Sequence, residues 1–384
     1  MGNKVAIIGI AQSKYVENRS DSLAEVIFDV CYRALQDARL NINDIESVTL
    51  GAHDMVDGRG ITTMLTAAPA GAYLKDEIRV AEDGAFAAAL ACLRILSGEF
   101  TNSLVVSWSK CSECDPGTLN TVANLSYDPF FYRPFALNDV ISYAIQAQQY
   151  KLKYGITDEQ AARVVVKNRA NALNNELSHL KSAVTIEDVL KSSPSSTPLK
   201  KLDLPPWSDG ACAMVIANEG LARKMKKQSA WVKGFGWSND TYYSGDKELS
   251  KLESLSAAAS KAYKMAGISN PSKELDVAEI HDITSYQELM EYEALGFCPE
   301  GMGGKYIQSG ATSMTGDIPV NPSGGCLSTN PYTAVGLIRV AEAALQVTGR
   351  AGNHQVPGVK TALAHGISGL SAQSNCVFIL SKNQ

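Results

Sequence analysis

The sequence has no surplus of basic residues. Its 35 Lys and Arg residues are outnumbered by 40 Asp and Glu residues, which gives a formal net charge of −5. Such a surface offers no broad positive field to attract nucleic acid or anionic lipid. We therefore expect neither of them to be the main partner.

Long hydrophobic runs are also missing. The longest, residues 85–96, is interrupted by Arg94 and is well short of the roughly 20 apolar residues that span a membrane. The apolar stretch Lys4–Ile10 is followed at once by polar residues, a pattern that indicates a first β-strand and not a secretory signal. We expect a cytoplasmic protein.

Motifs for disulfides, metals and phosphate are absent as well. The eight cysteines are scattered, and several lie in apolar runs, which is typical of buried thiols in a reducing compartment. Cys111 and Cys114 form a Cys-Ser-Glu-Cys pair, but no second pair stands at zinc-site spacing. The stretch GMGGK (301–305) lacks the phosphate-loop pattern. The sequence predicts no metal site and no covalently bound cofactor.

What the chain does have is a regular alternation of strand and helix patterns. Residues 4–10, 45–51 and 103–107 have the composition of buried strands, while 22–38 and 85–96 carry apolar residues at helical spacing. With 384 residues, 45% hydrophobic and 20% charged, the chain is long enough for two or three domains. The alternation predicts an α/β fold with parallel sheets and crossover helices.

The pattern occurs twice. Residues 22–51 and 254–281 both run from Ser-Leu through a helix and a polar turn into a strand, and the helix after Asp83 has a counterpart in 331–345. This indicates a duplicated core. Between the copies, residues 115–200 differ in texture, with an aromatic cluster (127–135) and polar helices. We interpret them as an insertion over one face, where substrate specificity usually lies.

Three longer stretches resemble one known family. They are TPLKKLDLPPWSDGACAMVIA (197–217), VAEIHDITSYQELMEYEALGFCPEGMGG (277–304) and PVNPSGGCLSTNPYTAVGLIRVAEAALQVTGRAG (319–352). They are similar, in the same order, to segments of the thiolase superfamily, especially its sterol-carrier-type and archaeal branch. The resemblance also extends to the nucleophile-less thiolase-like aldolases of steroid side-chain degradation.

This resemblance implies an architecture. We expect a duplicated thiolase fold in five layers (αβαβα), with an N-terminal half (1–114 and 201–235), an inserted loop domain (115–200) and a C-terminal half (236–384). It further implies an acyl-CoA substrate, with coenzyme A present only as part of that substrate, and a homodimer. Relatives of this kind commonly associate with a small zinc-ribbon/OB-fold partner subunit.

Two departures from the family change the expected chemistry. The thiolase nucleophile is a cysteine at a helix N-terminus, where the dipole favours the thiolate; here the stretch is VAEDGAFAAAL, with Asp83 at that position. The histidine that activates the nucleophile is replaced in STNPYTAVG by Asn330, with Tyr332 two residues on. An acyl-aspartate would be a labile mixed anhydride, so we expect the acyl-enzyme chemistry to be lost. Cys92, Cys326 and Cys376 are expected to pack in the core and not to replace the nucleophile.

The retained residues predict what survives. His281, in the His-Asp motif, is expected to donate a hydrogen bond to a thioester enolate, with the adjacent Asp282 helping to orient it. Tyr332 or Tyr286 is expected to move the proton, and His365, which matches the C-terminal histidine of the sterol-carrier branch, could favour the phenolate. If the tyrosines are dispensable, Asp83 becomes the leading base.

Three functions remain open from the sequence. The leading one is retro-aldol carbon–carbon cleavage of a β-hydroxyacyl-CoA without a covalent intermediate. The second is an atypical acyltransferase or condensing enzyme. The third is a non-catalytic thiolase-like subunit, against which the retained His281 and His365 argue. His179 and His354 lie in polar stretches and are expected at the surface.

Overall fold

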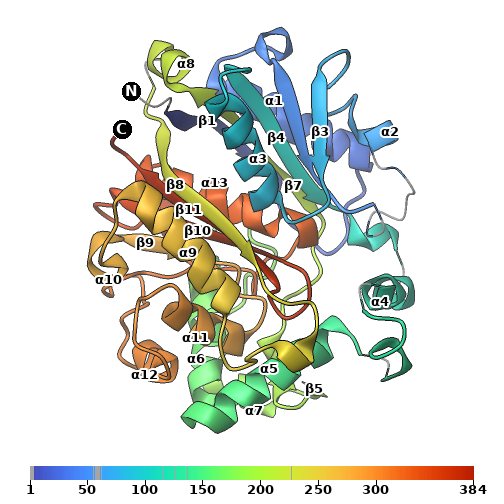
Figure 1. Cartoon of the computed structure of the whole chain (residues 1–384), viewed down its shortest axis with the longest axis vertical. Helices are drawn as coiled ribbons and strands as arrows, with labels where there is room; N and C mark the ends of the chain where they lie inside the picture. Colours follow the sequence, from blue (N-terminus) through green and yellow to red (C-terminus); the bar gives the residue numbers. More distant parts are fainter. Residues whose placement is uncertain are drawn as a thin grey trace.

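The N-terminal part of the chain folds into a five-stranded sheet with helices on both faces. The computed structural model describes residues 4–54, 56, 61, 63–114, 116–125, 127–135, 137–225 and 227–384 (Figure 1). The elements of this part are β1 (Val5–Gln12), α1 (Leu23–Ala38), β2 (Ser47–Gly51), α2 (Thr63–Thr66), β3 (Asp76–Val80), α3 (Gly84–Leu96), β4 (Asn102–Ser109), β7 (Gly210–Asn218) and α8 (Glu219–Lys224).

The inserted segment and the C-terminal part supply the remaining elements. The segment contains α4 (Pro116–Leu125), α5 (Asp139–Tyr154), α6 (Asp158–Ala172), α7 (Ile186–Lys191), β5 (Pro194–Ser196) and β6 (Leu199–Lys200). The C-terminal part contains β8 (Ala230–Asn239), α9 (Glu253–Ala266), α10 (Pro271–Glu274), β9 (Val277–Glu279), α11 (Ser285–Ala294), α12 (Gly303–Gln308), α13 (Val335–Val347), β10 (Thr361–Ser368) and β11 (Ser374–Ser381).

Both halves arrange their strands in the same order. The strands run β3-β2-β4-β7-β1-β8-β11-β10-β9, and Val320 bridges to Ala278 beyond β9. Numbered within each half, with Val320 in third place, both sheets have the order 3-2-4-5-1. In each half the last strand, β7 or β11, is antiparallel to its two neighbours. In contrast, β2 runs parallel to β4 in the first half, and β9 runs parallel to β10 in the second. The predicted duplication is therefore confirmed.

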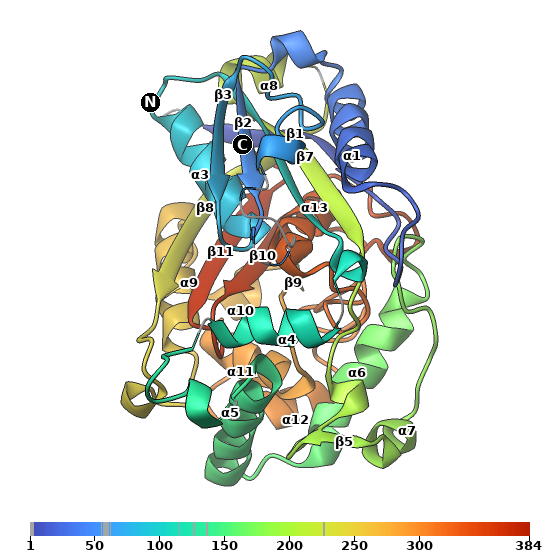
Figure 2. The ribbon, with the colours of Figure 1, turned by 90° about the vertical axis from the view of Figure 1, so that its right-hand side faces the viewer.

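The helices form layers around these sheets. Helix α1 packs on β1 and β7, α9 packs on β8 and β11, and α3 packs against α13 between the two sheets (Figures 1 and 2). The antiparallel pairing of Val5–Ile7 with Ala230–Val232 joins the sheets. Eight of the 13 residues of α3 and 12 of the 13 residues of α13 are buried, as expected for helices that pack between sheets. This is the five-layered α/β architecture that the sequence predicts.

The inserted segment covers one end of the C-terminal half. Helices α5 and α6 contact α11, and α6 also contacts α12, so the insertion lies against the region that follows β9. No helix among the described residues is long and apolar enough to cross a membrane.

One surface prediction was wrong: His354 is buried, and its Nε2 lies 2.8 Å from Glu342 Oε2 on α13.

Candidate active site

Asp83 lies where the N-termini of α3 and α13 meet. Its Oδ1 accepts a hydrogen bond from Ala85 N at 2.9 Å, and its Oδ2 accepts one from Gly336 N at 2.7 Å. Helix N-termini favour a negative charge through their dipoles and free N–H groups. Burial nevertheless raises the pKa of the Asp83 carboxyl to about 7, although the hydrogen bonds from these two N–H groups lower it. The group can therefore exchange a proton near neutral pH.

Two glycines make room for this carboxylate. A Cβ at Gly336 or at Gly366, on β10, would overlap with Asp83 Oδ1. The sequence analysis missed both positions. A signal was present, because a glycine inside a helix or a strand often marks a close approach of another group.

His281 follows β9 and faces Asp83. Its Nδ1 lies 3.9 Å from Asp83 Oδ2 and accepts a hydrogen bond from Ile367 N at 3.1 Å. Burial, His365 and Arg339 lower the pKa of His281 well below its usual value, so the ring is neutral. Since Nδ1 is an acceptor, the ring proton is on Nε2. Within the described part of the chain, no acceptor bonds to Nε2, which leaves this N–H for a ligand.

Asp282 does not orient His281, contrary to the prediction. Its carboxylate accepts hydrogen bonds from Cys326 N (2.5 Å), Leu327 N (3.2 Å) and Asn168 Nδ2 (2.7 Å). It thus anchors the loop after β9 to the glycine-rich loop at 321–327. The backbone of Ile367 on β10 takes over the orienting role that the sequence assigned to Asp282.

His365 is buried one residue before Gly366 on β10. Its Nε2 lies 2.8 Å from Asn375 Oδ1, and its Nδ1 lies 3.8 Å from Glu291 Oε1. Burial lowers the pKa of His365 to about 4, although the hydrogen bond with Asn375 raises it. The imidazole is therefore neutral at pH 7 and carries no positive charge that could stabilise a phenolate.

Tyr332 begins the short 3-10 helix η6 (Tyr332–Ala334), directly before α13. Its ring stacks on Trp207 with the centroids 5.7 Å apart, and its backbone has φ 31°. Burial, together with Asp139, Cys111 and Tyr127, raises the pKa of the Tyr332 hydroxyl well above its usual value. These surroundings favour a protonated hydroxyl that donates, and they do not favour the phenolate base that the sequence suggested.

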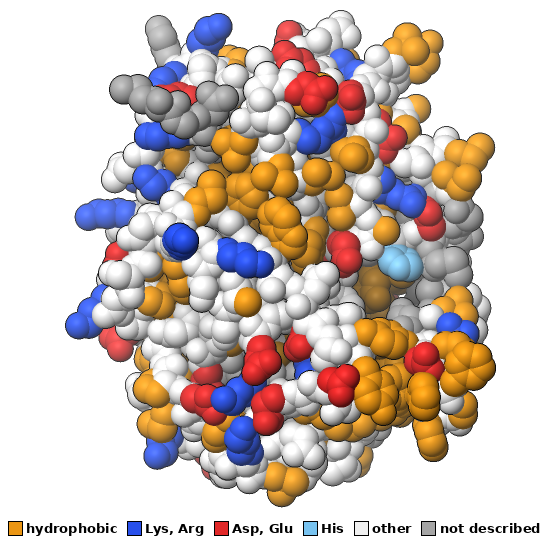
Figure 3. Space-filling model, in the orientation of Figure 1, with side chains coloured by type: hydrophobic (Ala, Val, Ile, Leu, Met, Phe, Trp, Pro, Cys, Tyr) orange, Lys and Arg blue, Asp and Glu red, His pale blue; other side chains and the backbone are white. Residues whose placement is uncertain are grey.

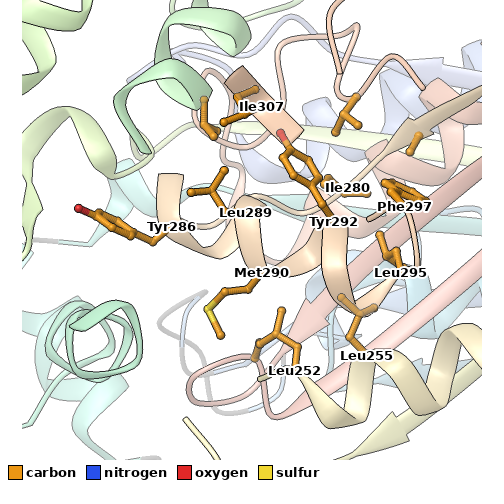
Figure 4. Packing of buried hydrophobic residues seen from close by; sticks show 14 of the residues in the cluster. Leu252, Leu255, Ile280, Tyr286, Leu289, Met290, Tyr292, Leu295, Phe297 and Ile307 are labelled. Carbon is orange, nitrogen blue, oxygen red and sulfur yellow. The ribbon is translucent and has the colours of Figure 1, made fainter. Parts of the chain in front are cut away.

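Tyr286 is directed to a different place. It lies in the first turn of α11, and its hydroxyl donates a hydrogen bond to Asp158 Oδ1, at the start of α6, at 2.5 Å. Figure 4 shows its hydroxyl pointing away from Tyr292 and Phe297, toward the inserted segment. Among the described residues, its hydroxyl makes no hydrogen bond with Asp83 or His281. Tyr286 therefore ties α11 to the insertion.

Comparison with known proteins identifies the family. A family profile described as "Thiolase C-terminal domain-like" matches residues 237–382. An acetyl-CoA acetyltransferase of Methanothermobacter thermautotrophicus is 30% identical over 375 residues, covering 95% of this chain and 96% of that protein. The chain belongs to the thiolase superfamily. Sterol carrier protein 2 of Oryctolagus cuniculus is 36% identical over 227 residues, covering 57% of this chain and 41% of that longer protein.

The thiolase fold is supported by solved structures too. The structure titled "Ltp2-ChsH2(DUF35) aldolase" superposes with a TM-score of 0.85 at 23% identity and covers 98% of this chain and 97% of that one. At this identity the likeness concerns the fold alone. The predicted fold and family are thus confirmed.

Thiolase chemistry requires a reactive thiolate, and the candidate cysteines of this thiolase-superfamily chain do not provide one. Cys92, Cys326 and Cys376 are fully buried, and burial raises the pKa of each thiol above its usual value, to about 12 for Cys92. The thiol, and not the thiolate, is the stable form in such a place. Among the described residues, no three His, Cys, Asp or Glu side chains are grouped to hold a metal ion.

Proposed function

We propose that the chain is a CoA-thioester carbon–carbon lyase that cleaves β-hydroxyacyl-CoA by a retro-aldol reaction. The observation that carries the proposal is Asp83: a carboxylate, in place of a thiol, bonded to the N-termini of α3 and α13. A carboxylate there is a poor acyl carrier but a competent base. The name of the similar aldolase structure supports the same reaction class.

The proton steps follow from the pKa of Asp83. Ionised Asp83 accepts the β-hydroxyl proton, the carbonyl of an aldehyde or ketone forms, and the Cα–Cβ electron pair moves into the thioester as an enolate. Asp83 then returns the proton to Cα, which gives the shortened acyl-CoA. Because burial holds the pKa near 7, both directions of transfer are accessible at neutral pH. No oxidant or metal is consumed in this sequence.

His281 stabilises the enolate in this mechanism. Its Nε2–H is free to donate, and the Ile367 N–H fixes the tautomer from the other side of the ring. A neutral imidazole held in this way needs no reorganisation as charge develops on the thioester oxygen. His281 is therefore the oxyanion donor and Asp83 the base, with Tyr332 as a hydrogen-bond donor to the substrate hydroxyl oxygen.

The two tyrosines give a matched test of this assignment. Tyr332→Phe is expected to lower kcat by about 100-fold, the effect of losing one positioned hydrogen-bond donor to the reacting oxygen. Tyr286→Phe should change kcat by less than about 3-fold, because its hydroxyl bonds to Asp158, and should instead cost about 1 kcal/mol of stability. Steady-state kinetics and thermal unfolding of both variants decide the matter. Equal activity of the two variants would remove Tyr332 from the mechanism.

Acyl transfer is the second candidate, supported by the name of the similar acetyl-CoA acetyltransferase of Methanothermobacter thermautotrophicus. It requires a covalent acyl-enzyme, which intact-mass measurement after incubation with acetyl-CoA would detect. We expect no adduct on the wild-type chain. Asp83→Cys should also fail to restore thiolysis, because Asn330 stands in place of the activating histidine. Turnover of acetoacetyl-CoA with CoA by either protein would favour the acyltransferase.

The surface supports assembly with other chains. Strand β3 is an edge strand of the sheet (Figure 2), and open edges readily pair. Ile78 on this strand is exposed. Hydrophobic side chains also gather at the lower right of Figure 3. Phe130, Phe131 and Phe135 of the inserted segment are exposed. We propose a homodimer that binds a small zinc-ribbon/OB-fold subunit. Light scattering and co-purification test the two parts separately.

The decisive assay uses short β-hydroxyacyl-CoA substrates, with and without co-purified partner. The expected products are a shortened acyl-CoA and an aldehyde or ketone in equal amounts. Calorimetry should first show that acyl-CoA binds at micromolar concentration, as is usual for enzyme substrates. Binding without any turnover, also in the presence of the partner, would indicate a non-catalytic subunit.

A further inference from the structure

Helix α11 carries a buried carboxyl group without a partner. Glu291 is 0% exposed, and within the described part of the chain neither of its carboxyl oxygens has a hydrogen-bond partner. An ionised carboxylate in such a place is strongly disfavoured, so the group gains a proton instead. The mechanism proposed above does not use Glu291.

The neighbouring groups add to this preference. Glu291 faces Asp282 from the loop after β9, Glu288 from its own helix, Lys167 from α6 and His365 from β10. The cation does not compensate, because Lys167 Nζ lies 2.6 Å from Glu288 Oε1 and donates to Val320 O at 2.8 Å. Burial first, and then the two carboxylates, raise the pKa of Glu291 well above its usual value. Glu291 is a neutral carboxylic acid, and its proton needs an acceptor.

His365 supplies that acceptor. Asn375 Nδ2 donates to Ser254 Oγ at 2.7 Å and to Ala372 O at 2.8 Å, so Asn375 Oδ1 must accept from His365 Nε2–H at 2.8 Å. The lone pair of His365 is therefore on Nδ1. Among the residues that the structure describes, this buried atom has no hydrogen-bond partner, and it lies 3.8 Å from Glu291 Oε1. The protonated carboxyl of Glu291, a donor, thus faces the acceptor Nδ1 of His365. Their separation exceeds a hydrogen-bond length by about 1 Å.

The strand that carries His365 also builds the candidate site. Its next residue, Gly366, lies against Asp83, and the one after that, Ile367, donates its N–H to His281 Nδ1 at 3.1 Å. We propose that Glu291 is a positioning residue: its carboxylic acid donates a hydrogen bond to His365 Nδ1, and this bond fixes the β10 segment that holds His281 and Asp83. The bond itself does not depend on which reaction the site performs.

Thermal unfolding against pH tests the protonation state. Glu291→Gln keeps the shape and an N–H donor but has no proton to lose, and Glu288→Gln, one turn earlier on α11, is the matched control. The unfolded chain ionises Glu291 above about pH 4.3, while the folded chain keeps it neutral, so wild-type stability falls with rising pH. Relative to wild type, the melting temperature of Glu291→Gln should rise progressively from pH 5 to pH 8. Glu288→Gln should lower it at every pH, because it breaks the ion pair with Lys167.

Two further readouts test the positioning role. Glu291→Met has no donor, so the 15N resonance of His365 Nδ1 should move to the position of a free lone pair. Its kcat should fall by about 10- to 100-fold with KM unchanged, whereas Glu291→Gln should stay within about 3-fold of wild type. If the melting temperature of Glu291→Gln does not rise relative to wild type between pH 5 and pH 8, Glu291 is ionised in the folded chain, and this result would overturn the proposal. An unchanged 15N resonance of His365 Nδ1 in Glu291→Met would also overturn the proposal. If Glu291→Met does not fold, Glu291→Ala serves for the same measurement. If neither substrate nor product is known, the unfolding and resonance readouts still decide the Glu291–His365 bond independently of the proposed reaction.

Discussion

Replacing Asp83 with asparagine is expected to lower kcat by about 100- to 10,000-fold, the range for removing a general base. An amide cannot accept the substrate proton at neutral pH. Its NH2 group would also face one of the two N–H donors, Ala85 N or Gly336 N, that now bond to the carboxylate. A buried donor left unpaired in this way costs about 1–3 kcal/mol of stability. Acyl-CoA binding, followed by calorimetry, should persist.

The pH profile separates loss of a base from loss of structure. As a base, Asp83 must be ionised, so wild-type kcat/KM should rise with pH through about 7 and then level off. The residual activity of Asp83→Asn should lack this rise. Asp29→Asn, which removes an exposed carboxylate paired with Arg33 on α1, controls for the change of charge and should keep the wild-type profile. Wild-type rates in Asp83→Asn would transfer the base role to another group.

The sequence predicted those features that depend on neighbouring residues. The helix expected over 22–38 is α1, and its start is fixed by a capping box in which Ser22 and Glu25 bond reciprocally over three residues. The duplicated plan was visible for a similar reason, since each half repeats the same local succession of strand and helix. Both halves then adopt one strand order, because the same succession of elements packs in the same way.

Hydrogen bonds between residues far apart in the sequence could not be predicted in this way. The hydroxyl of Tyr286 bonds to Asp158, 128 residues away, and the amide of Asn168 bonds to Asp282 over 114 residues. His354 lies in a polar stretch and was expected at the surface, yet it is buried against Glu342. Such pairs depend on how α6, α11 and α13 pack, and local polarity carries no information about that. The same holds for Glu291, whose sequence neighbours give no sign of its isolation.

Replacing His281 with phenylalanine is expected to lower kcat by about 100- to 1,000-fold. Removing one oxyanion donor costs about 3–4 kcal/mol of transition-state stabilisation in enzymes that use one. Phenylalanine keeps a planar ring of similar volume but has no N–H for the enolate. It also leaves Ile367 N without its acceptor, Nδ1, so the variant should lose about 1 kcal/mol or more of stability. His281→Gln, which retains an N–H donor, should recover part of the rate.

The shape of the pH profile distinguishes a donor from a base at this position. Because burial, His365 and Arg339 lower the pKa of His281 well below its usual value, the ring is neutral near pH 7 and does not titrate with the activity there. His281→Phe should therefore reduce the rate equally at every pH and leave the rise through about pH 7 unchanged, since that rise belongs to Asp83. The enolate can also be followed by hydrogen–deuterium exchange at Cα of the product acyl-CoA. The rate of this exchange should fall by the same factor in His281→Phe. Disappearance of the pH-dependent rise in His281→Phe, with exchange unaffected, would instead make His281 the base and Asp83 a structural cap of α3.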